Sequence, residues 1–524
     1  MEQIVIIRMA IHKVYLHQSC VLAPLPPIGR SGETNGLSMT VADRLKDPTL
    51  LVTDAFVGGR WVQASDGKQI AVHDPATGLP VASVPDLGVI ETRLAIEAAD
   101  AAWPAWRSRP NVERGEILMR WHDLIMANID DLAMIMTHEQ GKPLAEARGE
   151  VVYGASFVKW YAEEARRIDG DVIPAPTRDR RIMLLKEPVG VCAAITPWNF
   201  PIAIMTRKCA PAFAAGCPII VKPSELTPLS ALAIARLAQR AGIPEGVFGV
   251  LTGMPGEIGG ELTSNPIVRK LSFTGSTRVG QILMGQCAGT LKRLSLELGG
   301  NAPFIVFDDA DVELAVAGVM ASKFRNAGQT CVCANRILVQ SGIHDRFVER
   351  LTAAIAELKV GPGTAPGVTI GPLINEAAVA KVEAHVADAV AKGARIVRTG
   401  HCKADGLLVP PVLLSDVTTE MKLAHEETFG PVAPVFRFEE ESDAIRIAND
   451  TPFGLAAYFY TNDLKRSWRV TEQLQFGMVG LNTGSVSLDV APFGGVKQSG
   501  FGREGAKLGI EEYLATKTFH VGGL

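Results

Sequence analysis

An alternation of short, apolar, strand-like runs with helical stretches is the feature that most constrains the fold. The predicted strands cover residues 189–196, 219–221, 247–251 and 270–273, and the predicted helices between them cover 202–215 and 229–241. Strands without polar alternation are buried on both faces, and helical connections allow consecutive strands to run parallel. The pattern therefore predicts an α/β fold with a parallel sheet that helices cover on both sides.

A second alternation of the same kind begins after Leu298. Its predicted strands cover 302–307 and 337–339, and its predicted helices cover 312–325, 344–358, 377–391 and 442–449. A chain of 524 residues is too long for a single hydrophobic core. We therefore expect two α/β domains: a Rossmann-like cofactor domain made of residues 39–169 and 188–297, and a second domain made of residues 298–500.

Two stretches belong to neither predicted unit. Residues 170–187 combine Pro174 and Pro176 with alternating arginine and apolar side chains, which is typical of a hairpin, and residues 501–524 include a strand-like run. The unpaired edges of a protruding hairpin invite association unless a partner covers them. We expect both segments to mediate oligomerisation, giving a homodimer or a homotetramer.

The composition excludes several classes of protein. Lys and Arg total 52 against 56 Asp and Glu, so no large positive field is available for nucleic acid or an anionic membrane. No apolar run approaches the ~20 residues that a membrane helix needs. The 8 cysteines lack the spacing of a zinc site or a disulfide scaffold, which favours a reducing, cytoplasmic environment and no bound metal.

Residues 1–38 form a separate N-terminal extension in this interpretation. Glu2 and Glu33 are its only acidic side chains, and the globular pattern begins after Met39. Three interpretations stay open for this segment: a targeting peptide, a disordered tail, or an upstream extension with Met39 as the natural start.

The strongest local signal of chemistry is FRNAGQTCVCANR, residues 324–336. Cys331 lies at a predicted tight turn between a helix and a strand. Backbone N–H groups at such a turn can lower the pKa of a thiol and can stabilise an oxyanion, as a nucleophile requires. A buried, unreactive thiol is the alternative for a cysteine considered alone.

Two further motifs supply groups that could assist a nucleophile. In LELGGNAP, Glu297 ends a strand between apolar residues, which raise the pKa of a carboxyl group toward that of a useful general base. In TPWNFP, Asn199 follows the carboxyl end of a strand and can donate to an oxyanion. Considered alone, Glu297 also fits a salt bridge and Asn199 a helix cap.

Weaker signals indicate a dinucleotide. FTGSTRVG places Gly275 and Gly280 between a strand and a helix, where phosphate can meet the helix N-terminus. The spacing of these glycines departs from G-x-G-x-x-G, so the motif alone indicates only a turn. Lys222 and Glu225, in VKPSE, follow a strand and could bind ribose hydroxyls, although such a pair is more often simply solvated.

Taken together and in this order, TPWNFP, VKPSE, FTGST, LELGGNAP, FRNAGQTC, EETFGP and PFGGVKQSG resemble the NAD(P)-dependent aldehyde dehydrogenase superfamily over residues 57–519. The resemblance implies an aldehyde dehydrogenase-like fold with a catalytic domain over residues 298–500. It implies Cys331 as nucleophile, Glu297 as general base and Asn199 with the Cys331 N–H as oxyanion hole, with Lys208 near the catalytic centre. The residues that it places at the cofactor are Thr196, Trp198, Lys222, Ser224, Glu225, Gly275, Ser276, Glu427 and Phe429.

The implied reaction oxidises an aldehyde to a carboxylic acid. The thiolate of Cys331 attacks the aldehyde carbon, and Asn199 stabilises the alkoxide of the resulting thiohemiacetal. Loss of hydride to the nicotinamide leaves a thioester, and Glu297 then activates the water that releases the acid.

Two arginines indicate a substrate with a second, anionic end. Arg207 follows Asn199 by eight residues and Arg325 precedes Cys331 by six, and a guanidinium group matches a carboxylate. Pairing of each arginine with a protein carboxylate is the alternative. FRNAGQTCVC and TRKCAPAFAAGC resemble succinate-semialdehyde dehydrogenases, in which matching arginines and the serine at Ser487 hold the substrate carboxylate. Glutarate semialdehyde is the nearest competitor, because one methylene changes binding by only ~1–3 kcal/mol.

Three choices stay open at this level. Glu225 would accept ribose hydroxyls of NAD and repel the 2′-phosphate of NADP, which favours NAD, although Ser224 and Lys222 could accommodate the phosphate. Cys333 could form a reversible disulfide with Cys331 and silence the enzyme. A non-catalytic ligand-binding or structural homologue is the alternative of another class, and the presence of thiol, carboxylate and amide together favours the enzyme.

Overall fold

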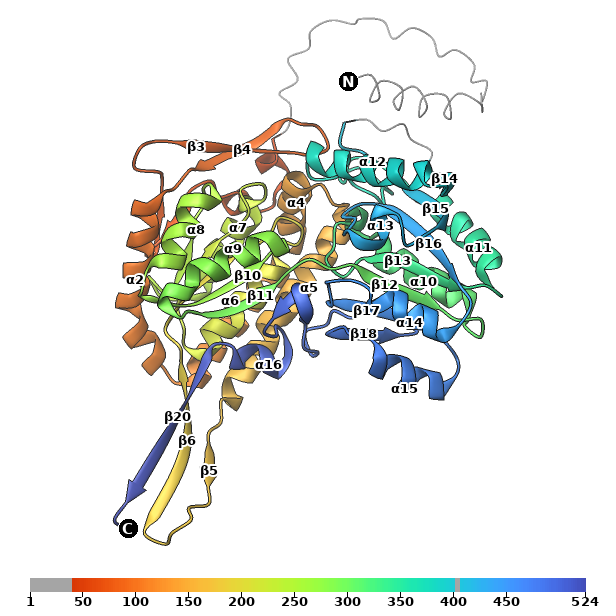
Figure 1. The fold of residues 1–524 in the computed structure, drawn as a ribbon. Coiled ribbons are helices and arrows are strands. Elements are labelled where there is room, and N and C mark those ends of the chain that lie inside the picture. Colours follow the sequence, from red (N-terminus) through yellow and green to blue (C-terminus); the bar gives the residue numbers. More distant parts are fainter. Residues whose placement is uncertain (1–39, 401–405) are drawn as a thin grey trace, which may run out of the picture. The chain divides into compact units, whose positions relative to one another are not determined.

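The computed structural model describes residues 40–400 and 406–524. Two large sheets covered by helices carry this part of the chain (Figure 1). The predicted α/β fold with two parallel-sheet units is therefore confirmed. The predicted extension over residues 1–38 lies outside the described residues.

The first sheet has eight strands, of which β7 to β11 run parallel. In spatial order the strands are β19 (Gly500–Phe501), β11 (Arg293–Glu297), β10 (Val268–Thr274), β7 (Val191–Ile195), β8 (Ile219–Lys222), β9 (Phe248–Val250), β1 (Ala55–Val57) and β2 (Arg60–Val62). The chain builds outward from β7 through β8 and β9, then returns to the other side of β7 with β10 and β11. Neighbouring strands β7 and β10 therefore form a switch point, where a doubly wound sheet opens a ligand crevice at its carboxyl edge.

Helices cover both faces of the first sheet. On one face α6 and α7 pack with α3, α4 and α5, and α2, α8 and α9 lie on the other. The bounds are α2 (Val89–Ser108), α3 (Asn111–Ala127), α4 (Ile129–Gln140), α5 (Leu144–Glu164), α6 (Ala203–Ala215), α7 (Pro228–Ala241), α8 (Pro255–Ser264) and α9 (Thr277–Cys287). Every residue of α6 is buried, because this helix lies between the sheet and a further layer of helices. Burial on both faces explains why the strand sequences lack polar alternation.

The second sheet has seven strands, all parallel to their neighbours except the edge strand β14. Their spatial order is β14 (Arg395–Thr399), β15 (Val412–Val417), β16 (Val432–Phe438), β13 (Ala334–Gln340), β12 (Ala302–Val306), β17 (Ala456–Tyr460) and β18 (Met478–Leu481). The helices of this half are α10 (Val312–Lys323), α11 (His344–Ala356), α12 (Glu376–Ala391), α13 (Lys422–His425), α14 (Glu441–Asn449) and α15 (Leu464–Gln473). This half has its own buried apolar core.

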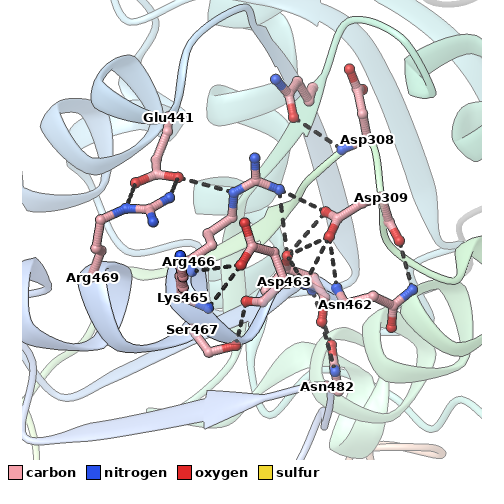
Figure 2. A network of polar contacts seen from close by, with 12 residues as sticks. Asp308, Asp309, Glu441, Asn462, Asp463, Lys465, Arg466, Ser467, Arg469 and Asn482 are labelled. Carbon is pink, nitrogen blue, oxygen red and sulfur yellow. Dashed lines mark hydrogen bonds and ion pairs between the residues drawn. The ribbon is translucent and has the colours of Figure 1, made fainter.

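A network of polar contacts links the end of β12 to α14 and α15 (Figure 2). The carboxylate of Asp309, just after β12, accepts hydrogen bonds from the Thr461 hydroxyl at 2.8 Å and from the backbone N–H of Asn462 at 2.8 Å. Arg466 of α15 donates to Asp309 at 2.7 Å and to Glu441 of α14 at 2.9 Å. One arginine therefore ties two helices to the end of a central strand.

A three-stranded antiparallel arm projects from the first half (Figure 1). It consists of β5 (Asp171–Ile173), β6 (Arg180–Pro188) and β20 (Leu514–Gly522), with β6 between the other two. Most side chains of β5 and β20 are exposed. The predicted hairpin over residues 170–187 is present in this arm, and its role in oligomerisation stays a prediction.

The other predicted oligomerisation segment, residues 501–524, is divided between two places. Phe501 pairs with Leu296 in the first sheet, and α16 (Ala506–Glu511) packs against α5 and α6. Only the last strand reaches the arm. The sequence prediction does not separate these parts, because the pairing of β19 with β11 joins residues that are about two hundred positions apart in the chain.

Helix α4 and strands β1 to β4 are absent from the sequence prediction. Strands β3 (Gln69–His73) and β4 (Pro80–Pro85) form a separate two-stranded ribbon in which few residues are buried, so they lack the continuous apolar signature of the central strands. Helix α4 follows α3 after the single residue Asn128, so no turn signal separates the two helices in the sequence.

Candidate active site

Cys331 lies on a tightly folded loop between α10 and β13. Three consecutive residues of this loop, Asn326, Ala327 and Gly328, have φ values of 51°, 54° and 77°, in the left-handed region. A β-carbon at Gly328 would clash with the backbone carbonyl of Gly430, so this position requires glycine. The loop thereby packs against the EETFGP segment, which lies far away in the sequence.

The thiol of Cys331 is not activated by this loop in the way that the sequence suggests. Burial raises the pKa of Cys331 to about 12, and the negative charges of Glu427 and Glu297 act in the same direction. The guanidinium groups of Arg207 and Arg325 oppose this rise. The net shift of the thiol pKa is therefore upward, opposite to the lowering that the sequence suggests, and burial is its largest cause.

Glu297 is the last residue of β11 and is buried. Neither oxygen of its carboxyl group has a hydrogen-bond partner among the described residues. Burial, assisted by the negative charge of Glu504, raises the pKa of Glu297 well above its ordinary value. The apolar surroundings thus have the effect on this carboxyl group that the sequence predicts, and the group is free to bind water or a reacting atom.

Asn199 belongs to the loop between β7 and α6 and is also buried. Its side-chain amide donates to the backbone carbonyl of Gln329 at 3.0 Å, which joins this loop to the loop that carries Cys331. The amide nitrogen carries two N–H groups, so one remains for another acceptor. The amide of Asn199 is thus bonded to the loop of Cys331, and the charge of Glu297, at the end of β11, acts on the same thiol.

Arg207 and Lys208, both on α6, bind the same buried carboxylate. The Nε of Arg207 donates to Glu504 at 2.6 Å, and the ammonium group of Lys208 contacts the other oxygen of Glu504 and the Ser272 hydroxyl. The two cations lower the pKa of Glu504 to about 2. For Arg207 the pairing with a protein carboxylate, open in the sequence interpretation, is thus present, and its guanidinium group also lies 4.1 Å from the ring of Phe493.

A cavity of about 480 Å³ lies beside the Cys331 loop. Its wall includes Arg325, Val332 and Ser487, so two of the three predicted substrate-binding residues line one space. The guanidinium group of Arg325 lies over the ring of Phe200 at 5.2 Å. The third predicted residue, Arg207, is not part of this wall, although its charge acts on the same thiol.

Tyr153 is a site residue that the sequence prediction lacks. Its hydroxyl group lies 2.5 Å from the hydroxyl of Ser487, which is 334 residues later in the chain. Tyr153 is on α5, and no motif surrounds it in the sequence. Only the packing of α5 against the loop that follows β18 brings these hydroxyl groups together.

The crevice at the switch point of the first sheet suits a dinucleotide. The hydroxyl groups of Thr196 and Thr274, at the carboxyl ends of β7 and β10, are buried without a hydrogen-bond partner in the part of the chain that the structure describes. Ser276 caps the N-terminus of α9, and a β-carbon at Gly275 would clash with the ring of Phe273. Unpaired hydroxyls and a helix N-terminus at one sheet edge fit a phosphate-bearing ligand.

The loop after β8 lies at the same edge of the sheet. The Thr196 N–H donates to the carbonyl of Lys222 at 3.0 Å, and the ammonium group of Lys222 is 2.9 Å from the carboxylate of Glu225. Burial of Glu225 opposes its ionisation, but the ammonium group lowers the net pKa of Glu225, so the group is a carboxylate at neutral pH. Ser224 accepts from the N–H of Leu226 within this turn.

The EETFGP segment closes the crevice from the second half of the chain. Glu427 accepts from the N–H of Gly300 at 3.0 Å, and burial raises the pKa of Glu427 to about 7. The ring of Phe429 meets that of Trp198 edge to face, with 5.7 Å between the centroids. All the predicted cofactor residues thus lie along the edge of the first sheet or on the segment that faces it.

Two other predictions concern thiols and metals. Cys333 is buried with its sulfur directed at the carbonyl of Lys323, at 3.5 Å, and a disulfide with Cys331 stays a prediction. Among residues 40–400 and 406–524 there is no cluster of three His, Cys, Asp or Glu side chains suited to a metal ion. No helix in the same residues is both long and apolar enough to cross a membrane.

Comparison with known proteins shows the family of the chain. Residues 61–519 match the aldehyde dehydrogenase family. Two relatives are a glutarate-semialdehyde dehydrogenase of Pseudomonas aeruginosa, 59% identical over 92% of this chain and 100% of the relative, and the succinate-semialdehyde dehydrogenase [NADP(+)] GabD of Escherichia coli, 58% identical over 91% and 100%. The crystal structure of an aldehyde dehydrogenase from Brucella melitensis biovar abortus 2308 superimposes with a TM-score of 0.91 at 59% identity, covering 92% of this chain and 99% of that one. The chain therefore belongs to the aldehyde dehydrogenase family.

Proposed function

We propose that this protein oxidises a short aldehyde that bears a terminal carboxylate, with succinate semialdehyde as the preferred substrate and NAD as the preferred cofactor. The observation that carries the proposal is the cavity beside the Cys331 loop, whose wall contains Arg325 and Ser487. A guanidinium group and a hydroxyl group supply matched donors for a carboxylate at the far end of the substrate.

In the proposed mechanism Cys331 is the nucleophile. Burial raises the thiol pKa, so formation of the thiolate requires a base, and we assign this role to Glu297, whose charge acts on the thiol and whose two carboxyl oxygens have no partner among the described residues. Attack on the aldehyde carbon gives a thiohemiacetal. Its oxyanion accepts hydrogen bonds from the free N–H of the Asn199 amide and from the backbone N–H of Cys331.

The nicotinamide, when bound in the switch-point crevice, supplies the acceptor for the hydride that leaves the thiohemiacetal. This step leaves a thioester on Cys331. Glu297 then takes a proton from the water that hydrolyses the thioester, and its raised pKa makes this carboxylate a stronger base than an exposed glutamate. Lys208 acts on the site indirectly, because its ammonium group binds Glu504 and lowers the pKa of Glu297 electrostatically.

The cofactor residues have roles that follow from their positions. Lys222 and Glu225 are proposed to bind the ribose, Gly275 and Ser276 the phosphates at the N-terminus of α9, and Glu427 the ribose on the nicotinamide side. Thr196, Trp198, Ser224 and Phe429 complete the walls of the crevice. The carboxylate of Glu225 favours NAD, because it accepts hydroxyl groups and repels a 2′-phosphate.

Glutarate semialdehyde is the second candidate substrate. The relatives named after glutarate and succinate semialdehydes share 59% and 58% identity with this chain, so similarity does not choose between them. The cofactor is similarly open to test, since the Escherichia coli relative is named for NADP. We also propose a cytoplasmic homo-oligomer that associates through the arm.

A steady-state panel tests the substrate and the cofactor together. Succinate semialdehyde, glutarate semialdehyde and butanal are each assayed with NAD and with NADP by absorbance of the reduced nicotinamide. We expect the highest kcat/KM for succinate semialdehyde with NAD. A higher kcat/KM for butanal contradicts the carboxylate-bearing substrate, and no absorbance change with any aldehyde indicates a non-catalytic homologue.

Substitution of Arg325 tests the carboxylate contact itself. Arg325→Met should lower kcat/KM for succinate semialdehyde by about 10- to 100-fold, because a hydrogen bond to a charged group contributes roughly 1.5–3 kcal/mol. The same substitution should lower kcat/KM for butanal by a smaller factor, because this aldehyde loses only the charge that opposes the rise of the Cys331 pKa. Arg350→Met, at a surface arginine paired with Glu313, is the matched control. Equal losses for both aldehydes would show that Arg325 does not bind the substrate carboxylate.

A further inference from the structure

We infer that Asn326 is a positioning residue for the oxyanion site. Its side-chain amide holds the backbone carbonyls of Asn199 and Gln329 together, and so aims the remaining N–H of Asn199 at the reacting oxygen. The inference rests on the proposed function, in which Asn199 stabilises the alkoxide. Asn326 itself touches neither substrate nor cofactor in this role.

The hydrogen bonds around Asn326 fix which way its amide points. The backbone N–H of Lys142 donates to the side-chain oxygen of Gln140 at 3.0 Å, so the Gln140 nitrogen is the donor on its other side. That nitrogen donates to the side-chain oxygen of Asn326 at 3.0 Å. The Asn326 nitrogen therefore points away from Gln140, and it donates to the carbonyls of Asn199 at 3.1 Å and Gln329 at 3.4 Å.

These bonds close a ring between two loops that are far apart in the sequence. Asn326 and Asn199 are separated by 127 residues, and the Asn199 amide in turn donates to the Gln329 carbonyl at 3.0 Å. The ammonium group of Lys142 supports the ring with a 2.7 Å bond to the Asn199 carbonyl. With one N–H of its amide and its backbone carbonyl both held, Asn199 has little freedom to rotate, and its second N–H is left for the oxyanion.

The backbone of Asn326 is suited to this position and anchored in it. Its φ of 51° is in the left-handed region, which asparagine and aspartate adopt more readily than other side chains with a β-carbon. Its N–H donates to the carboxylate of Glu146 at 2.8 Å. The side chain of Gln329 holds its own backbone in place. Its amide nitrogen donates to the carbonyls of Asn326 and Pro372, and its oxygen accepts from the N–H of Ile374. The ring is therefore rigid on both sides of the amide.

The test is a double-mutant cycle of Asn326→Asp with Asn199→Ala. Aspartate preserves the shape and the backbone preference of asparagine, but it replaces the donor by an oxygen that faces two carbonyl oxygens. We expect Asn326→Asp to lower kcat by about 10- to 100-fold. Removal of an oxyanion donor itself lowers kcat by ~10²–10³-fold, and this sets the upper limit of the effect. In the Asn199→Ala background the same substitution should lower kcat by less than about twofold, because residues that act as one unit are not additive.

Asn482→Asp is the matched control. Asn482 shares the left-handed conformation, with a φ of 53°, and its amide likewise donates to a carbonyl, that of Thr461 at 3.0 Å. Its side chain belongs to the polar network of the second sheet (Figure 2). We expect kcat of this variant to stay within about twofold of the unsubstituted enzyme. Dissociation constants for NAD, measured by fluorescence quenching, should be unchanged in both aspartate variants.

The outcomes separate this inference from the proposed function. The positioning role of Asn326 is overturned if Asn326→Asp lowers kcat by the same factor in both backgrounds, or if it leaves kcat of the otherwise unsubstituted enzyme unchanged. Either result leaves the proposed oxyanion role of Asn199 intact. An unchanged kcat in Asn199→Ala overturns the proposed oxyanion role and the inference with it. If Asn326→Asp does not fold, Asn326→Gly carries the same cycle, because glycine adopts the left-handed backbone freely and lacks the amide.

Discussion

At the scale of single residues, the site depends on groups that are costly to keep buried. Glu297 has two carboxyl oxygens without a partner, and its pKa is raised by burial first and by Glu504 second. Cys331 is likewise less acidic than an exposed cysteine. Such groups favour catalysis because they can exchange protons or attack, but the carboxyl group of Glu297 reduces stability because no partner among the described residues satisfies it.

Glu297→Gln should therefore stabilise the fold while it impairs turnover. Because the pKa of Glu297 is raised in the folded state, its contribution to stability is present below the ordinary pKa of 4.5 and is lost as the pH rises toward the folded value. We expect the variant to unfold at a temperature higher by roughly 2 °C or more at pH 8, with a smaller gain at pH 5. Thermal unfolding at the two pH values measures this difference.

The same variant should accumulate the thioester. Rapid mixing should show a burst of about one reduced nicotinamide per subunit followed by slow turnover, since deacylation needs the missing base. Glu245→Gln, at an exposed glutamate, is the control for both measurements. If Glu297→Gln and Glu245→Gln raise the unfolding temperature by the same amount at each pH, the stability change does not come from the burial of Glu297.

At the scale of elements, the carboxylates of Asp309 and Glu441 link the end of one strand to two helices. Asp309 follows β12 and binds the turn that leads into α15, where Arg466 links it to Glu441 of α14 (Figure 2). Burial opposes ionisation of Asp309, but the hydrogen bonds from Thr461 and Asn462 and the charge of Arg466 lower the net pKa of Asp309.

Asp309→Asn should destabilise the second half of the chain by about 1–3 kcal/mol at pH 7, because the amide cannot accept all of these bonds. The stability that Asp309 contributes is present above its ordinary pKa of 3.8 and is lost as the pH falls through the lower folded value. The difference in unfolding free energy between Asp309→Asn and the unsubstituted protein should therefore become smaller as the pH approaches 3.

Urea unfolding at pH 7 and at pH 3 measures this difference in unfolding free energy between Asp309→Asn and the unsubstituted protein. Asp308→Asn is the control, since Asp308 contributes its backbone N–H to the network rather than its carboxylate. We expect the control to change stability by less than about 0.5 kcal/mol. A gap for Asp309→Asn that widens in acid would contradict the direction of its pKa shift.

At the scale of the whole molecule, the arm exposes apolar side chains and an open strand edge. Val172 and Phe519 are 70% and 47% exposed on it, and β5 leaves one edge of the small sheet unpaired. Exposed apolar side chains beside an open strand edge are features that a second subunit can cover.

Truncation after Leu514, which removes most of β20, should convert the oligomer into monomers. Light scattering after size-exclusion chromatography measures the mass of each form. Val390→Lys, at a 44% exposed apolar residue on α12, is the control and should leave the oligomer intact. A full-length protein that elutes as a monomer would contradict the predicted homo-oligomer.

The sequence by itself determined the local features of this protein. Apolar runs and helical periodicity predicted β7 to β10 of the first sheet and β12 and β13 of the second, since their buried faces leave a signature over a few consecutive residues. Motif order was enough to place Cys331 in a tight loop and Glu297 at a strand end. It also indicated Arg325 and Ser487, which line the cavity together.

Only the tertiary structure decided what depends on residues that are distant in the chain. The pairing of Arg207 with Glu504, the contact of Tyr153 with Ser487 and the ring through Asn326 each join separate elements. The acidity of Cys331 belongs here too, because a pKa sums burial and charge from every direction. At Cys331 the largest of those contributions is burial, followed by the charge of Arg207, which is distant in the sequence.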